Sequence, residues 1–386
     1  MIKQKYNLSS TTWGSEEISA MQDVINSGNL TIGKKVKDFE NNFADYHNMK
    51  HAVMVNSGSS ANLLMVAALL FKSNNPIKQG DEVIVPAVSW STTYTPLQQV
   101  GLKVKFVDID IETLNFDLVQ LKEAISSKTR LIMCVNLLGN PNRFDEINKI
   151  IGDRDITMIE DNCESMGAIY NDQLAGTFGE MGSFSTYFSH HISTMEGGLV
   201  VTNNEELYHI MLSLRSHGWT RSLPDNSKIY KKRDDQFYES FNFILPGYNL
   251  RPLEIEGAIG IEQLKKLNGF IDKRRTNAKK FQEVMSSKHN LRIQKEIGKS
   301  SWFGFSIMPI GKDPECFLQL KDFLVESGFE IRPIVAGNFL KNKVIDYFDY
   351  SVHGQVDNAN FVHDYGLFIG NHHFQMTEAF EQLKKF

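Results

Sequence analysis

Short apolar runs alternate with helical stretches between about residue 50 and residue 215. Most runs are continuously apolar rather than alternating, which is typical of strands buried on both faces of a sheet. The expected strands are Ala52–Val55, Glu82–Val85, Lys103–Val107, Leu131–Val135, Thr157–Glu160, Ser183–Thr186 and Leu199–Val201. The expected helices between them are Ala61–Phe71, Leu118–Ile125, Phe144–Ile151 and Glu205–Ser213. This alternation predicts an α/β fold, with a mostly parallel sheet flanked by helices.

The pattern changes after residues 245–247, which read Leu-Pro-Gly. The elements expected beyond this point are helices at Pro252–Leu267 and Ile271–Met285, a strand at Trp302–Met308, a helix at Glu315–Ser327 and a strand at Glu330–Pro333. We therefore expect a large domain over residues 1–250 and a smaller α+β domain over residues 251–386. The polar stretch 223–236 is expected to be an exposed loop.

Composition narrows the class of protein. The chain has 386 residues, of which 41% are hydrophobic and 23% charged, the ordinary mix of a globular protein. A net charge of −5 argues against nucleic acid as a partner. No apolar run reaches the roughly 18 residues that a membrane span needs, and the N-terminus lacks the apolar core of a signal peptide. Three cysteines fit a reducing cytoplasm and cannot form a cluster that needs four thiolates, so we expect no metal.

The segment Asn56–Asn62 follows an expected strand and opens an expected helix. It contains Ser57, Gly58 and Ser59. Small residues at a helix start let a phosphate approach the free backbone N–H groups. Serine and glycine are also favoured there as simple helix caps, so this segment alone leaves both interpretations open.

Two further segments carry groups suited to catalysis. Asp161 and Glu164 follow the strand Thr157–Glu160, at the edge where α/β sheets build their sites. A helix cap or a structural ion pair would explain these carboxylates equally well. His190 lies between residues 182 and 198, and a lone histidine is more often structural than catalytic.

Taken together, the order and content of these segments resemble the sugar aminotransferase family of fold-type I pyridoxal-phosphate enzymes, which act on nucleotide-linked keto-sugars. The matching positions are Ser57-Gly58-Ser59, Asp161, Ser185, Glu196-Gly197-Gly198 and Gly247–Arg251. The resemblance implies that the serine turn and Ser185 hold the cofactor phosphate and that Asp161 pairs with the ring nitrogen. It also implies that Asn249 reaches the cofactor phosphate of a partner subunit, so a homodimer is expected.

Other positions gain roles from the same resemblance. Trp90 is expected to stack on the cofactor ring, and Glu164 to lie near the ring hydroxyl. Candidates for binding the sugar, its diphosphate or an amino-acid carboxylate are His217, Arg221, Arg251 and Arg332. Arginine suits these anions because its planar fork pairs with them through two parallel hydrogen bonds.

The chain departs from the family at the lysine that normally holds the cofactor. His190 occupies that position, and no lysine lies between Lys149 and Lys228. The resemblance therefore implies non-covalent binding of pyridoxamine 5′-phosphate, interconverting with pyridoxal 5′-phosphate. Residues 189–198 resemble the branch of the family in colitose biosynthesis that removes the carbon-3 hydroxyl of GDP-4-keto-6-deoxymannose. In that branch L-glutamate restores the amine form, and the products are ammonia, 2-oxoglutarate and a 4-keto-3,6-dideoxy sugar.

His190 suits this chemistry as base and then acid, because the pKa of an imidazole, ~6.5, lies near working pH. Three alternatives remain at this point. An ordinary nucleotide-sugar aminotransferase would need the missing lysine. A CDP-sugar 3-dehydrase would need an iron–sulfur ligand set that three scattered cysteines cannot supply. A catalytically silent binding protein would have little reason to keep Asp161, Ser57, Ser185 and Asn249.

Overall fold

An eight-stranded sheet forms the centre of the protein, whose computed structural model describes residues 4–386. Its strand order is β1-β9-β8-β5-β4-β2-β3-β13. The strands are β1 (His51–Val55), β2 (Glu82–Pro86), β3 (Lys103–Val107), β4 (Thr129–Val135), β5 (Thr157–Asp161), β8 (Met181–Ser185), β9 (Gly198–Thr202) and β13 (Tyr350–Val352). Only β9 runs antiparallel to its neighbours β1 and β8. The predicted α/β fold with a mostly parallel sheet is confirmed, and each strand expected before residue 215 is present with slightly different ends.

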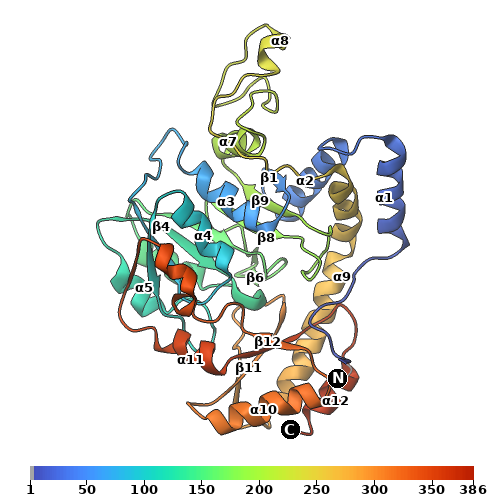
Figure 1. Cartoon of the computed structure of the whole chain (residues 1–386), viewed down its shortest axis with the longest axis vertical. Coiled ribbons are helices and arrows are strands. Elements are labelled where there is room, and N and C mark those ends of the chain that lie inside the picture. Colours follow the sequence, from blue (N-terminus) through green and yellow to red (C-terminus); the bar gives the residue numbers. More distant parts are fainter. Residues whose placement is uncertain (1–3) are drawn as a thin grey trace.

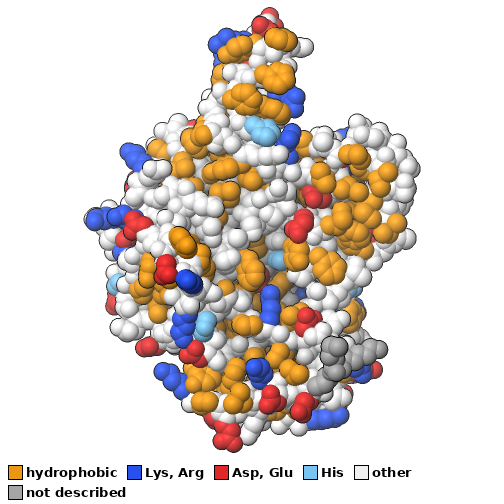
Figure 2. Space-filling model, in the orientation of Figure 1, with side chains coloured by type: hydrophobic (Ala, Val, Ile, Leu, Met, Phe, Trp, Pro, Cys, Tyr) orange, Lys and Arg blue, Asp and Glu red, His pale blue; other side chains and the backbone are white. Residues whose placement is uncertain are grey.

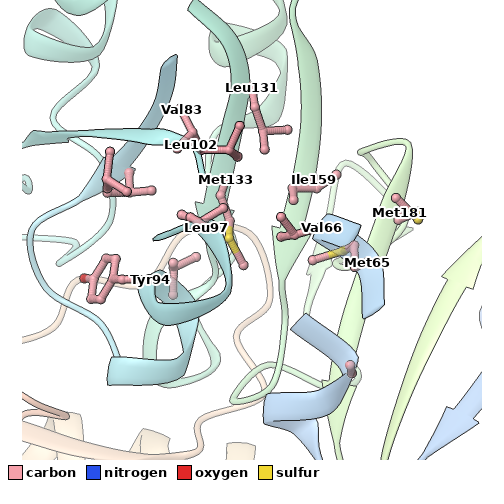
Figure 3. Close-up of a cluster of buried hydrophobic side chains, with 14 of the residues drawn as sticks. Met65, Val66, Val83, Tyr94, Leu97, Leu102, Leu131, Met133, Ile159 and Met181 are labelled. Carbon is pink, nitrogen blue, oxygen red and sulfur yellow. The ribbon is translucent and has the colours of Figure 1, made fainter. Parts of the chain in front are cut away.

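Helices cover both faces of this sheet (Figure 1). Successive strand residues point to opposite faces. Val83 and Val85 of β2 thus join one core with α3 (Gly58–Ala68), α4 (Ser91–Gln99) and α7 (Glu205–Arg215), whereas Ile84 joins another with α5 (Leu118–Ala124) and α6 (Phe144–Ile151). Figure 3 shows part of the first core, where α3 and α4 pack on β2, β4 and β5. Strands buried on both faces explain the continuous apolar runs.

A second, antiparallel sheet lies beside the first, with the order β10-β11-β14-β12. Its strands are β10 (Leu291–Ile293), β11 (Gly304–Pro309), β12 (Ile331–Pro333) and β14 (Leu367–Gly370). The helices of this part are α10 (Pro314–Glu326), α11 (Asp357–Tyr365) and α12 (Thr377–Leu383). The chain also returns β13 to the edge of the large sheet, parallel to β3. The division of the chain into two domains at residue 250 stays a prediction.

One long helix, α9 (Glu254–Met285), replaces the two helices expected over residues 252–285. That expectation was wrong, because the helix continues through Gly269. An exposed glycine in a helix costs only about 1 kcal/mol relative to alanine. Packing against α1 (Ser15–Ser27) and α2 (Lys34–Tyr46) outweighs that cost, and Figure 1 shows α9 running without interruption toward the small sheet.

An arm of about residues 219–246 projects beyond the large sheet and carries the short helix α8 (Gln236–Glu239), at the top of Figure 1. The stretch 223–236, expected to be a loop, has no regular element before residue 236 and is largely exposed. Elsewhere β6 (Ile169–Tyr170) and β7 (Gln173–Leu174) form a small hairpin. Between residues 4 and 386, no helix combines the length and apolar character needed to cross a bilayer.

Candidate active site

A cavity of about 400 Å³ opens where the strands of the large sheet end and the small sheet begins. The last residues of β4, β5 and β8, which are Val135, Asp161 and Ser185, all line it. Carboxyl ends of parallel strands are the usual location of sites in α/β folds. The sequence-predicted residues that the structure brings together here are Ser57, Gly58, Ser59, Trp90, Asp161, Glu164, Ser185, His190 and Arg332.

The start of α3 forms a narrow cradle at one end of the cavity. Ser57 caps the helix, and its hydroxyl accepts a hydrogen bond of 3.0 Å from the backbone N–H of Ser60. A Cβ added at Gly58 would lie 2.6 Å from the Cβ of Ser185, so only glycine permits this approach of helix and strand. The helix start supplies free N–H groups and a partial positive charge. The cradle therefore suits a phosphate group.

Asp161 is held in a fixed orientation by donors from α3, from α4 and from the turn that follows it. Its Oδ2 accepts hydrogen bonds from Asn62 Nδ2 at 2.9 Å and from Thr93 Oγ1 at 2.7 Å. Its Oδ1 accepts one from the backbone N–H of Cys163 at 3.2 Å. The residue is only 6% exposed and lines the cavity. Donors to both oxygens fix the carboxyl group at the wall of the cavity, where it can pair with a protonated ring nitrogen.

Sequence reasoning missed Asn62 and Thr93. Each is anchored in turn, because Ser183 donates to Asn62 Oδ1 at 2.5 Å and the hydroxyls of Ser89 and Thr93 lie 2.7 Å apart. Asn62 is a buried amide within the apolar run of α3, and a polar residue in such a run could have served as a signal. Its pairing with Asp161, far along the chain, appears only in the fold.

Glu164 and Arg332 face each other across the cavity. Glu164 Oε2 accepts a hydrogen bond of 3.1 Å from the backbone N–H of Leu138, and Oε1 lies 3.8 Å from Arg332 Nη2. Burial raises the pKa of Glu164 to about 7, although Arg332 and the Leu138 N–H act in the opposite direction. The Arg332 guanidinium lies 4.4 Å from the ring centre of Phe368 and 6.0 Å from that of Phe303. Its Nε is buried, with no hydrogen-bond partner in the described chain.

His190 lies on the loop between β8 and β9, with its ring centre 5.1 Å from that of Phe303. Burial, together with the charges of Arg332 and Arg274, lowers the pKa of His190 to about 3. Its Nδ1 is buried and has no partner among residues 4–386. The imidazole is therefore neutral at pH 7, and its Nδ1 has an unused hydrogen-bonding capacity.

His191 differs from its neighbour. It is fully buried, and its Nε2 lies 3.1 Å from the backbone oxygen of Ser301. It is absent from the cavity lining, so His190 is the histidine of the pair that can meet a ligand. Trp90, at the start of α4, also lines the cavity and is 53% exposed. Of the described residues that line the cavity, none is a lysine.

The other predicted site residues gather elsewhere, in what we call the Trp219 cluster: His217, Trp219, Arg221, Asn249 and Arg251. The guanidinium of Arg221 lies 4.3 Å from the Trp219 ring and that of Arg251 lies 5.7 Å from it. Arg251 Nε donates to Asn249 Oδ1 at 3.0 Å. His217 packs edge-on against Trp219 at 4.9 Å. Within the described residues neither arginine has a carboxylate within 4.0 Å, and no member of the cluster lines the cavity.

Comparison with known proteins places these features in a family. The sequence profile of the DegT/DnrJ/EryC1/StrS aminotransferase family matches residues 11–379. The chain belongs to this family. The resemblance seen in the sequence motifs is thereby confirmed.

Individual members of the family match along nearly the whole chain. The chain is 58% identical over 383 residues to the GDP-4-keto-6-deoxy-D-mannose 3-dehydratase of Escherichia coli O55:H7, and the match covers 98% of each chain. A solved structure of GDP-4-keto-6-deoxymannose-3-dehydratase with a trapped PLP-glutamate geminal diamine is 57% identical, with a TM-score of 0.97 and 99% of each chain covered. A histidine-to-asparagine mutant of that enzyme with bound GDP-perosamine has the same values.

Proposed function

We propose that this protein is an enzyme that removes the carbon-3 hydroxyl of GDP-4-keto-6-deoxy-D-mannose. Pyridoxamine 5′-phosphate serves as cofactor, and L-glutamate restores it after each turnover. The observation that carries this proposal is a cavity that combines the Asp161 carboxylate with a neutral His190 and has no lysine among the described residues that line it. The relatives named above support this reaction, since they match along nearly the whole chain and are 3-dehydratases of this GDP-sugar. Their structures with a PLP-glutamate adduct and with GDP-perosamine support glutamate and a GDP-sugar as ligands.

The residues present fit such a cofactor. Ser57, Gly58, Ser59 and Ser185 form the phosphate cradle, where Gly58 lets Ser185 pack against the start of α3 beside its free backbone N–H groups. Trp90 offers an aromatic face and Glu164 a carboxyl group for the ring oxygen. When bound, pyridoxamine phosphate supplies the reacting amine and an electron-accepting ring.

Asp161 acts by holding a proton on the ring nitrogen. Its orientation is set by Asn62 and Thr93 on Oδ2, which leaves Oδ1 with a single weaker contact at 3.2 Å. A charge-assisted hydrogen bond from the ring to this carboxylate is stronger than a neutral one. The carboxylate therefore keeps the ring able to accept electrons.

His190 takes up and returns protons beside the reacting carbon. A base must be unprotonated, and burial together with the two arginines ensures this in the bare cavity. The anionic groups of cofactor and substrate raise the pKa of a nearby imidazole toward the working range. An imidazole, unlike a lysine amine, does not form a stable imine with an aldehyde, so the cofactor is held non-covalently.

The enzyme acts as a homodimer in which the Trp219 cluster completes the cavity of the second copy. Two unpaired guanidiniums and Asn249 suit the cofactor phosphate and the substrate diphosphate. At and near the cavity, Glu196 and Glu256 have no cation within 4.0 Å among the described residues. Burial, reinforced by the neighbouring Glu196 charge, raises the pKa of Glu256 to about 7. The Glu196 carboxylate at the cavity and the two arginines of the Trp219 cluster are electrostatically complementary, as is common where protein surfaces associate.

Exposed apolar side chains support the same assembly. Figure 2 shows them over α1 and over the projecting arm. On α1 and after it they include Ile18, Ile25 and Leu30, each more than half exposed. On the arm Phe237 is 87% and Phe241 70% exposed. Apolar patches of this kind mark protein interfaces. We place this enzyme in the cytoplasm, where its nucleotide-sugar substrate and free thiols belong.

Product analysis tests the proposed reaction. Purified protein is incubated with GDP-4-keto-6-deoxy-D-mannose, pyridoxamine phosphate and L-glutamate, and ammonia, 2-oxoglutarate and the sugar are quantified. Equal amounts of ammonia and 2-oxoglutarate with a 3-deoxy sugar support the proposal. An amino sugar without ammonia would identify an aminotransferase instead, and no turnover would indicate a silent binding protein. The CDP-linked sugar, tested in parallel, measures preference for the base.

A further inference from the structure

Arg332 has an incomplete set of partners inside the cavity. Its Nη2 is 3.8 Å from Glu164 Oε1, beyond the usual length of a hydrogen bond. Its Nε is buried without a partner in the described chain, and its other close neighbours are the aromatic faces of Phe368 and Phe303. A guanidinium with unused donors and a loosely placed carboxylate can exchange that carboxylate for another.

The reaction requires such an exchange, because one cavity receives two different substrates in turn. The sugar presents an uncharged keto group and hydroxyl at its reacting end. The amino acid presents a carboxylate next to its amine. A cation beside the reacting carbon matches the amino acid and would be left uncompensated beside the sugar unless the protein supplies a counter-charge.

We propose that Arg332 binds a carboxylate of the amino donor and that Glu164 is its internal substitute. Glu164 pairs with Arg332 while the sugar occupies the cavity and releases it when the amino acid enters. This inference rests on the proposed function and assigns Arg332 to the amino-acid half of the cycle rather than to the sugar or its diphosphate.

The exchange has a consequence for protons. The groups that act on Glu164 are Arg332 from β12, Asp161 from β5 and the Leu138 N–H, and of these Arg332 stabilises the ionised form most. When a ligand carboxylate takes Arg332, the pKa of Glu164 rises above about 7 and the carboxyl takes up a proton. His190 also loses the effect of the Arg332 charge, and a proton taken up by His190 would persist in Glu164→Gln, which separates the two groups.

Calorimetry detects this proton without any turnover. Glutarate, a dicarboxylate with no amine, is titrated into the pyridoxal-phosphate-loaded enzyme at pH 7 in buffers of different ionisation enthalpy. We expect uptake of about half a proton per glutarate, because a carboxyl with a pKa near 7 is half ionised there. Uncharged glutaramide should cause none, and Glu164→Gln should abolish the uptake. Glutarate binding without proton uptake, or with equal uptake in Glu164→Gln, would overturn the inference.

Variants of the arginine give a second measure. Arg332→Met should weaken glutarate binding and raise the KM for L-glutamate by about 10- to 100-fold, the range expected for a hydrogen bond to a charged group. Arg332→Lys keeps the charge and is a check that the effect is not caused by misfolding. Its KM for L-glutamate should lie between the values for wild type and Arg332→Met. Arg143→Met is the matched control, since Arg143 is a surface residue whose ion-pair partner among the described residues is Glu146, at 3.5 Å.

A single-turnover assay separates this inference from the function on which it rests. Enzyme loaded with pyridoxamine phosphate is mixed with the keto-sugar in the absence of L-glutamate, and ammonia is measured. No ammonia from wild type would refute the proposed function itself. Ammonia from wild type together with an unchanged KM for L-glutamate in Arg332→Met would refute the role of Arg332 alone.

Discussion

The cavity and the Trp219 cluster are both rich in polar side chains, but they are held together differently. In the cavity, Asp161 is tied to three segments by hydrogen bonds of 2.7 to 3.2 Å, and the residues stand on strand ends. In the Trp219 cluster, Arg221 and Arg251 are held mainly by stacking on one indole. A site whose central carboxylate is fixed in place by its own chain is prepared for chemistry. A cluster of unpaired cations is one half of a site that another surface completes.

The largest expected effect comes from Asp161→Asn, inside the cavity. The amide keeps the shape of the side chain but cannot hold a ring proton, so activity should fall by several orders of magnitude while the fold remains. Ammonia release gives the loss, and the ultraviolet circular dichroism spectrum gives the fold. Turnover near that of wild type would show that another group protonates the ring.

His190→Asn should lower ammonia release by about 10²- to 10⁴-fold, the usual value of general acid–base catalysis. Cofactor binding should persist, because no covalent bond to the protein is lost. The companion His190→Lys should instead fix pyridoxal phosphate to the chain after borohydride reduction, as mass spectrometry would show. If borohydride also attached the cofactor to the wild-type chain, the prediction that the cofactor is bound non-covalently would be wrong.

Mixing two inactive variants tests whether the cavity and the Trp219 cluster belong to different copies. Asn249→Ala should lower activity through loss of a phosphate contact. Asn249→Ala is then unfolded and refolded together with His190→Asn, so that half of the dimers contain one chain of each variant. Each mixed dimer has one intact site out of two, so about one quarter of wild-type activity should return. His190→Asn mixed with Asp161→Asn is the control, since both lesions lie in the same cavity. No recovery in either mixture would assign the two regions to one chain, and recovery in the control would show that His190 and Asp161 do not share a cavity.

A smaller effect is expected from Thr93→Val, which removes one donor from Asp161 without changing its size. The loss should be about 10-fold, as for a single hydrogen bond to a charged group. The ring nitrogen should also lose its proton at a lower pH, visible in the absorbance of the bound cofactor. Thr93→Ser should restore both properties. An effect on melting temperature alone would reduce Thr93 to a packing role.

The smallest effect concerns stability and pH in the cofactor-free protein. The folded-state pKa of His190, about 3, lies below the usual 6.5, so unfolding takes up a proton as the pH falls below 6.5 and stability declines. His190→Asn removes this loss and should gain about 2 kcal/mol relative to wild type between pH 7 and pH 5. Urea unfolding at the two pH values measures it. A constant difference between the proteins would show that the imidazole is not held neutral.

The sequence predicts those parts of the site that depend on residues close together in the chain. Ser57, Gly58 and Asp161 lie at the end of a strand or the start of a helix that the apolar pattern marks, and His190 lies on the loop between two such strands. Asn62 could not be paired with Asp161 from the sequence, because the contact joins residues that lie far apart in the chain.

The same limit applies to the fold. The strands of the large sheet are continuously apolar and therefore visible, whereas β13 is three exposed residues that pair with β3 about 250 residues earlier. Helix α1 was missed for a different reason. Ile18 and Ile25 face outward, so α1 lacks the inward stripe by which a core helix is usually recognised.

The continuity of α9 has a mechanical consequence. A helix of 32 residues is about 48 Å long, and it contacts α1 and α2 near one end and α12 near the other. Folding the small sheet down over the large one would have to bend this rod and break its internal hydrogen bonds. Two fluorescent labels at opposite ends of α9 should therefore keep their separation when ligand enters. If α9 stays straight, the cavity must distinguish the keto-sugar from L-glutamate by rotation of side chains rather than by closure of the small sheet.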